Sequence, residues 1–333
     1  MRALVAPFLV AMVIAPAVSR ADEPTAGAAA TAEATATANP FRGSTITYRN
    51  SASALTFDKA GEPWYNPTWV MSLELAPRFA LNKIFSVGAS IDFSREITED
   101  DSSTLSGETW VGNLSLAFNA SKFVTIPGAG IDVSASVQAL FPTSLAAQYQ
   151  TMLFAVAPGL RLSRNFDVLS GISLGYGLRV TKNFHEYTTS ETETPQIPGC
   201  FNGAGGCESY LNTGVRNSSW RLSNSFDLSV AFTEWLSLDL SFAILTSYLY
   251  DAVEDGDVTL TPQEPQDIRT ALNYEVGVTF TPLSYFSVGL GATTFNPQLK
   301  PDSTNYEPFF NRYTALYLDL RLDVADLVAT ALR

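Results

Sequence analysis

The segment 235–250, WLSLDLSFAILTSYLY, constrains the fold more than any other part of the chain. Large apolar residues occupy its even positions and small or polar residues most of its odd ones: Leu236, Leu238, Leu240, Phe242 and Ile244 against Ser237, Asp239, Ser241 and Ala243. Side chains alternate between two faces along an extended strand, so one face requires an apolar medium. The run suits a strand tilted across a bilayer, which needs roughly 9 to 11 residues.

The same alternation recurs along the chain and predicts twelve strands. We expect them at 44–57, 68–81, 85–94, 109–119, 131–141, 151–162, 168–185, 217–232, 235–250, 268–280, 285–296 and 312–324. The first segment is the least regular, because Asn50 falls on its apolar face. The pattern predicts an all-β fold, an antiparallel up-and-down transmembrane barrel over 43–324, and disfavours a secreted soluble β-sandwich.

The two ends of the chain lack this alternation. Residues 1–21 combine Arg2, an apolar run and the small-residue pattern Ser19-Arg20-Ala21, which predicts a secretory signal peptide. A membrane anchor is the alternative, disfavoured by Pro7 and Pro16. Residues 22–42 are predicted to be a flexible periplasmic lead-in, and 325–333 a tail beyond the last strand.

The connections between the predicted strands alternate in length. Short turns are expected at 82–83, 163–166, 233–234 and 282–284, and long polar loops at 98–107, 188–215, 251–266 and 297–310. One connection, 120–129, is longer than its place in the order predicts. Because outer-membrane barrels have short periplasmic turns and longer extracellular loops, we expect both termini in the periplasm.

The charge balance excludes one class of partner. The formal net charge is −13, and the Lys and Arg residues are scattered, so nucleic acid is not an expected partner.

This arrangement resembles the outer-membrane β-barrels of Gram-negative bacteria, and the run Ala139 to Ser144, ALFPTS, is similar to loop starts of the phenol meta-pathway transporter family. The resemblance implies the outer membrane as location, with the lipid bilayer, lipopolysaccharide and the barrel assembly machinery as partners. Such barrels usually end in an aromatic residue, whereas this chain continues to Arg333. Either an internal signal is recognised or the tail packs against the barrel mouth.

Three features of the sequence have residue types that occur in chemical sites. Cys200 and Cys207 flank a Gly-rich turn in the longest loop and predict a disulfide, with two free thiols as the alternative. The acidic runs at 99–101 and 254–257 allow calcium binding but favour solvated loops, and no metal or cofactor is predicted. His185 lacks the His-x-Ser spacing of the outer-membrane phospholipases, and Ser173 is too far along the same face, so no catalytic residue is predicted.

The predicted inward face carries charges of both signs. We expect the lumen to be lined by eight charged residues: Glu74, Asp92, Arg179, Arg221, Arg269, Glu275, Asp319 and Arg321. Of these, Arg179, Arg221 and Arg269 are expected toward the outer mouth. Glu275, Asp319 and Arg321 are expected deeper inside. Small inward residues beside them, including Gly175, Gly177, Gly289 and Gly291, are expected to leave room. The sequence therefore favours a porin-like channel for a small solute that it does not identify. The alternatives are a phospholipase-type barrel enzyme and a structural or adhesive barrel.

Overall fold

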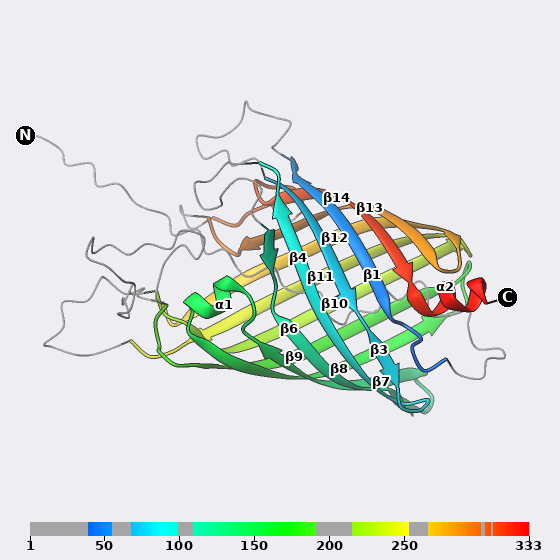
Figure 1. Cartoon of the computed structure of the whole chain (residues 1–333), viewed down its shortest axis with the longest axis horizontal. Helices are drawn as coiled ribbons and strands as arrows, with labels where there is room; N and C mark the ends of the chain where they lie inside the picture. The colour runs from blue at the N-terminus through cyan, green and yellow to red at the C-terminus, as the bar shows by residue number, and fades with distance from the viewer. Residues whose placement is uncertain are drawn as a thin grey trace, which may run out of the picture.

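The computed structural model describes residues 39–54, 68–98, 109–190, 215–252, 266–300, 304–307 and 309–332. They form one antiparallel sheet that closes on itself into a barrel, with a short helix at each end (Figure 1). The elements are β1 (Thr45–Ser53), β2 (Trp69–Ala76), β3 (Arg78–Ala80), β4 (Phe85–Glu96), β5 (Thr109–Val111), β6 (Leu114–Ile126), β7 (Ile131–Phe141), α1 (Leu145–Tyr149), β8 (Met152–Phe166), β9 (Ile172–His185), β10 (Ser218–Thr233), β11 (Leu236–Leu249), β12 (Ile268–Leu283), β13 (Phe286–Pro297), β14 (Thr314–Asp323) and α2 (Val324–Ala331).

The fourteen strand segments make twelve strands, as the alternation predicts. β2 and β3 are one strand interrupted at Pro77, which cannot donate a ladder hydrogen bond, and β5 and β6 are one strand interrupted at 112–113. The barrel closes because β1 pairs with β14 on one side and β2 on the other. The all-β, twelve-stranded antiparallel barrel is therefore confirmed.

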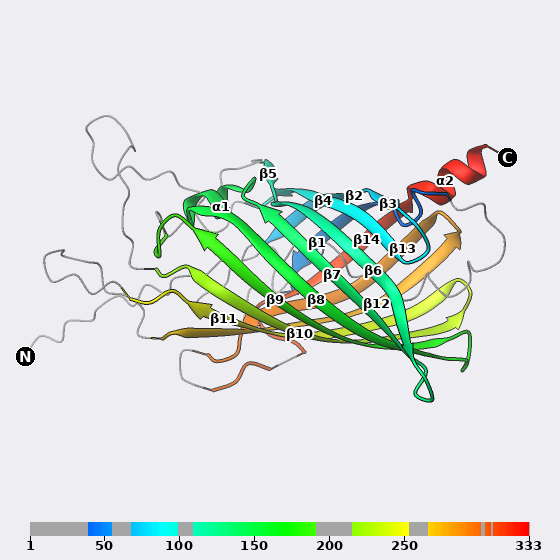
Figure 2. The ribbon, with the colours of Figure 1, turned by 90° about the horizontal axis from the view of Figure 1, so that it is seen from below.

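The two ends of the barrel differ. Residues 81–84, 127–130, 167–171, 234–235 and 284–285 make the short connections at one end, which we call the turn end; β1 begins and β14 finishes there. The other end, which carries α1, is the loop end (Figure 2).

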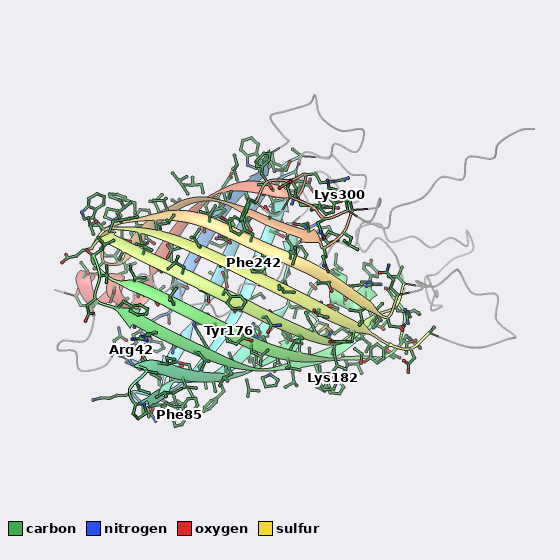
Figure 3. All side chains as sticks on the ribbon, turned by 180° about the vertical axis from the view of Figure 1, so that it is seen from behind. Arg42, Phe85, Tyr176, Lys182, Phe242 and Lys300 are labelled. Carbon is green, nitrogen blue, oxygen red and sulfur yellow. The ribbon has the colours of Figure 1, made fainter. Side chains whose placement is uncertain are left out.

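Large apolar side chains cover the outside of the wall. Leu290, Phe226 and Leu116 are 60%, 50% and 46% exposed, and Tyr176 and Phe242 lie on the outer surface in Figure 3. Exposed aromatic residues occur at both ends of this belt: Phe79, Phe85 and Phe280 toward the turn end, and Trp69, Trp220 and Tyr248 toward the loop end. A continuous apolar belt with aromatic borders on a closed barrel is the surface of a membrane-spanning barrel.

Two predicted connections are wrong in position. Residues 163–166 belong to β8, where Ser163 pairs with Gly175 and Phe166 with Ile172, so the turn falls at 167–171. The long connection at 120–129 is mostly strand: β6 continues to Ile126 and pairs with β7 to Ile131. A bulge around Lys122, whose φ is +45°, offsets the alternation there and hides the strand extension in the sequence.

Asn50 does lie on the outward face of β1, but its amide is paired. The Trp69 indole N–H donates to Asn50 Oδ1 at 2.8 Å, and Asn50 Nδ2 donates to the Tyr48 hydroxyl at 3.3 Å. These aromatic partners satisfy a polar group that would otherwise face lipid, so the first strand keeps its register.

Only part of the predicted ends lies in the described residues. The signal peptide 1–21 and most of the lead-in 22–42 fall outside them and stay predictions. The tail begins as α2, whose N-cap Asp323 accepts hydrogen bonds from the backbone N–H groups of Ala325 and Asp326. Ala325 is buried at the turn end whereas Leu332 is 83% exposed, so only the first turn of α2 packs against the barrel mouth. Among the helices of the described residues, none is long and apolar enough to cross a membrane.

Candidate functional site: the barrel interior

An ion-pair cluster joins the first and last strands inside the barrel. Arg49 on β1 donates from Nε and Nη2 to the two carboxylate oxygens of Asp319 on β14, at 2.7 and 2.6 Å, and its Nη2 lies 3.4 Å from Glu275 Oε1 on β12. The pairing with Asp319 is bidentate, the strongest geometry for an arginine and a carboxylate. Side-chain exposure is 22% for Arg49, 18% for Asp319 and 9% for Glu275.

Tyr317 and two glycines support this cluster. The Arg49 guanidinium carbon lies 4.1 Å from the centre of the Tyr317 ring, a cation–π contact. A Cβ added at Gly277 would lie 2.3 Å from the Tyr317 hydroxyl oxygen, and one at Gly291 would lie 2.5 Å from it. The glycines therefore allow Tyr317 to lie against the wall of β12 and β13, where it holds Arg49.

A second ion pair spans three strands. Arg161 Nη1 on β8 lies 2.9 Å from Asp227 Oδ2 on β10, and both side chains pass over Gly175 on β9. A Cβ on Gly177 would lie 2.4 Å from the Ser225 hydroxyl oxygen. The expectation that these glycines leave open space is wrong, because side chains from neighbouring strands fill it.

Asp239 on β11 is held by hydroxyl groups. Its carboxylate accepts hydrogen bonds from Ser229 at 2.6 Å, Ser237 at 3.1 Å and Thr279 at 3.2 Å. Three donors satisfy this charge without a cation, so Asp239 adds fixed negative charge to the inward face.

Three arginines line one wall between the middle of the barrel and the loop end. Arg221 on β10 and Arg269 on β12 both pair in register with Ser247 on β11, which lies between them, and Arg179 lies at the middle of β9. Arg221 Nε donates to the Ser247 hydroxyl at 3.3 Å, and Arg269 Nη2 donates to the carbonyl oxygen of Arg216 at 3.2 Å. Within the described residues, no carboxylate forms an ion pair with Arg179 or Arg221. We call Arg179, Arg221 and Arg269 the arginine wall.

Two acidic side chains lie on the opposite wall. Glu74 on β2 and Asp92 on β4 are direct cross-strand partners on the inward face. The β2/β3 strand is second around the ring and β10 is eighth, six positions apart in a ring of twelve, so the two strands lie on opposite sides of the barrel. Glu74 and Asp92 therefore lie across the barrel from the arginine wall. Strands β9 to β12 on that side also carry the inward Asp227, Asp239 and Glu275.

The eight predicted lumen residues are thus divided among several places. Glu275 and Asp319 meet at Arg49, which the sequence did not single out because the first strand is irregular. Arg321 lies two residues nearer the turn end, opposite Ser287 and Thr47. The roles of all eight in solute passage stay predictions.

The loop end contains a buried polar cluster that the sequence did not indicate. Arg216 is 2% exposed and pairs with Asp267 at 2.8 Å, and it also donates to the carbonyl oxygens of Tyr250 and Gln266. Asn217 donates to the carbonyl oxygens of Gln150 and Tyr187. These bonds tie the bases of three loops together at the mouth.

His185 belongs to the same region. Its Nδ1 lies 2.7 Å from the Gln150 carbonyl oxygen, and its ring contacts the Tyr250 ring edge-on with the centres 5.9 Å apart. Ser173 is near the other end of β9, about 40 Å along the strand from His185 at 3.3 Å per residue. No Ser–His pair forms there. Cys200 and Cys207 lie outside the described residues, so the disulfide stays a prediction. In the described part of the chain, no group of three or more His, Cys, Asp or Glu side chains is placed to hold a metal ion.

Comparison with known proteins supports the fold. No family model and no curated protein matches the chain. Among solved structures it is similar to an outer-membrane channel from Pseudomonas putida F1, with 12% identity and a TM-score of 0.53 over 86% of this chain and 96% of that one. It is also similar to the NanC porin (6% identity, TM-score 0.43, 84% of this chain and 98% of that one). It is similar as well to the KdgM porin in complex with disordered oligogalacturonate, with 7% identity and a TM-score of 0.42 over 84% of this chain and 98% of that one.

The likeness to the Pseudomonas channel shows a shared fold. The chain therefore has the fold of an outer-membrane β-barrel, and the resemblance drawn from its alternating strands is confirmed at that level. The soluble β-sandwich is excluded by the closed barrel. The similarity of ALFPTS to phenol meta-pathway transporters stays a prediction.

Proposed function

We propose that the protein is a passive channel of the outer membrane of a Gram-negative bacterium, with its termini in the periplasm, and that it passes small solutes with a preference for anions. The observation that carries this proposal is the arginine wall. Several other inward charges pair with each other, as Arg49 does with Asp319 and Arg161 with Asp227, or bond to hydroxyl groups, as Asp239 does. The positive charges of Arg179 and Arg221 have no such described ion pair and are available to a passing anion.

The acidic pair on the opposite wall, Glu74 and Asp92, would orient a passing solute. A dipolar solute crossing between Glu74 and Asp92 on one side and the arginine wall on the other would turn its negative end toward the arginines. Carboxylated or phosphorylated small molecules have the chemistry that such an interior favours, because arginine binds both groups through bidentate hydrogen bonds.

Reversal potentials in a salt gradient test the preference. Replacing Arg179, Arg221 and Arg269 with glutamine should lower the ratio of chloride to potassium permeability several-fold, because the field of the constriction loses three positive charges. Arg164→Gln is a single-site control, which removes one arginine whose side chain lies on the outward face over Phe166 and should leave the ratio unchanged. An unchanged ratio in the triple variant would place the constriction elsewhere.

A barrel enzyme is the second candidate function for this chain. The contacts of His185 with a backbone carbonyl and with Tyr250 do not favour it as a catalytic base, and Ser173 is far from it. We expect no enzymatic activity.

A further inference from the structure

The connection between β13 and β14 lies on the outside of the barrel. We call its described residues, 298–300, 304–307 and 309–313, the outer strap. Phe309 makes an edge-on contact with Tyr274, with ring centres 5.0 Å apart, and Tyr274 belongs to the outward face of β12. Figure 2 shows this orange segment outside the wall near the loop end. The strap therefore covers part of the lipid-facing surface instead of the pore mouth.

The strap covers polar side chains on that surface. Thr294 on β13 and Thr314 on β14 face outward, yet they are 1% and 0% exposed, and their hydroxyl oxygens lie 3.0 Å apart. Asn296 is 1% exposed, and its Oδ1 accepts a hydrogen bond from Asn311 of the strap at 3.2 Å. Facing lipid without partners, these groups would cost free energy, so the strap fits as a fixed part of the barrel exterior.

The surface that the strap presents is aromatic and basic. Phe309 and Phe310 are 64% and 60% exposed. Next to them Tyr306 and Tyr313 make an edge-on contact at 5.4 Å, with Lys300 Nζ 5.7 Å from the Tyr306 ring centre and Arg312 Cζ 5.2 Å from the Tyr313 ring centre. Aromatic rings beside lysine and arginine are typical of the interface between lipid tails and anionic headgroups.

The same combination recurs at another point of the loop end. Lys182 lies on the outward face of β9, with its Nζ 4.9 Å from the Trp220 ring and 5.7 Å from the Phe184 ring. Figure 3 shows Lys182 and Lys300 at the same end of the barrel, on opposite sides of the view. Both lysines are therefore suited to one level of headgroups around the barrel.

We propose that the outer strap is a lipid-binding element, in which Phe309 and Phe310 insert among acyl chains of the outer leaflet and Lys300 contacts a phosphate of the lipid A part of lipopolysaccharide. This proposal rests on the outer-membrane location proposed above. Charge complementarity and continuity with the apolar belt select this partner: the strap joins the belt at Tyr274, and its cations are at the loop end, where the outer-leaflet headgroups lie.

Spin-label accessibility tests the insertion. Nitroxides are attached to the Phe309→Cys or Phe310→Cys variant of a chain in which Cys200 and Cys207 are replaced by serine. The labelled protein is reconstituted in liposomes that contain lipid A. Leu290, 60% exposed on the belt, gives the lipid reference, and Leu332, 83% exposed on α2, gives the water reference. We expect nitroxides at the strap sites to be relaxed by oxygen and not by a water-soluble nickel complex, as at Leu290.

The outcomes separate the two proposals. Sites 309 and 310 that behave like Leu332 while Leu290 remains in lipid would overturn the strap alone. Leu290 in water would overturn the membrane location itself. If the serine background does not fold, quenching of the additional tryptophan in Phe310→Trp by brominated lipid answers the same question.

Lipid retention tests the phosphate contact. Native mass spectrometry of the detergent-solubilised chain should show Lys300→Gln retaining lipid A about fivefold more weakly than the unmodified chain, the effect of one lysine near an anionic lipid surface. Lys83→Gln, at the turn end, is the matched control and should leave retention unchanged. Equal loss in both variants, or equal loss of phosphatidylglycerol and lipid A in Lys300→Gln, would overturn the assignment to lipid A.

Discussion

Arg49→Gln should destabilise the folded barrel by about 2–3 kcal/mol. Removing one partner of a largely buried ion pair is destabilising, and here two carboxylates, Asp319 and Glu275, would lose the arginine that they share. The expected cost is below the full range for buried pairs because Arg49 keeps 22% of its side chain exposed. Urea unfolding in liposomes, followed by heat-modifiable gel migration, measures the change.

A double-mutant cycle isolates this interaction. Asp319→Asn combined with Arg49→Gln should recover part of the loss, with a coupling energy of about 2 kcal/mol. Arg164→Gln, which removes an outward arginine, should cost less than about 1 kcal/mol. Additive effects of the two inward substitutions would show that the first and last strands are held together without this pair.

Gly291→Ala should destabilise the folded barrel more than the addition of one methyl group usually does. The added Cβ would lie 2.2 Å from the Val276 carbonyl oxygen and 2.5 Å from the Tyr317 hydroxyl oxygen, and the carbonyl belongs to the sheet itself. Overpacking of this kind costs about 1–3 kcal/mol, and here it also displaces the ring beneath Arg49.

Gly289→Ala is the control two residues away on the same strand. Its nearest neighbour would be Asp319 Cβ at 3.3 Å, a side-chain contact that a small shift relieves. We expect the Gly291→Ala barrel to be clearly less stable than the Gly289→Ala barrel in the same unfolding measurement. Equal stability would mean that Tyr317 does not depend on the absence of a side chain at Gly291.

The number of strands and the face that each turns toward lipid could be predicted from the sequence, because apolar and polar residues alternate within the strand itself. In β11 the apolar residues occupy one face and Asp239 with its serine neighbours the other, so the side facing lipid follows from alternation alone. Bulges are harder to predict: the extra residues around Lys122 interrupt the alternation, and the continuation of β6 to Ile126 is visible only through its pairing with β7.

The residue types that line the interior could be predicted from the sequence, but not which of the charged residues form ion pairs. Arg49 and Asp319 are 270 positions apart, and they meet only because the barrel closes between β1 and β14. The glycines give no sequence signal of what covers them, since Gly291 is covered by Tyr317 from the next strand and Gly175 by side chains from both sides. The outer strap was predicted only as a polar loop, because its contact with Tyr274 depends on the path of the chain outside the wall.

Conductance of the purified protein in a planar bilayer tests directly whether the barrel is an anion-selective channel. We expect discrete current steps when folded, heat-modifiable protein is added, and a reversal potential in a salt gradient on the anion-selective side, since Arg179 and Arg221 have no described ion pair to neutralise them. Protein denatured by heat before addition is the blank. No ion current at any voltage from protein verified as folded would contradict the channel.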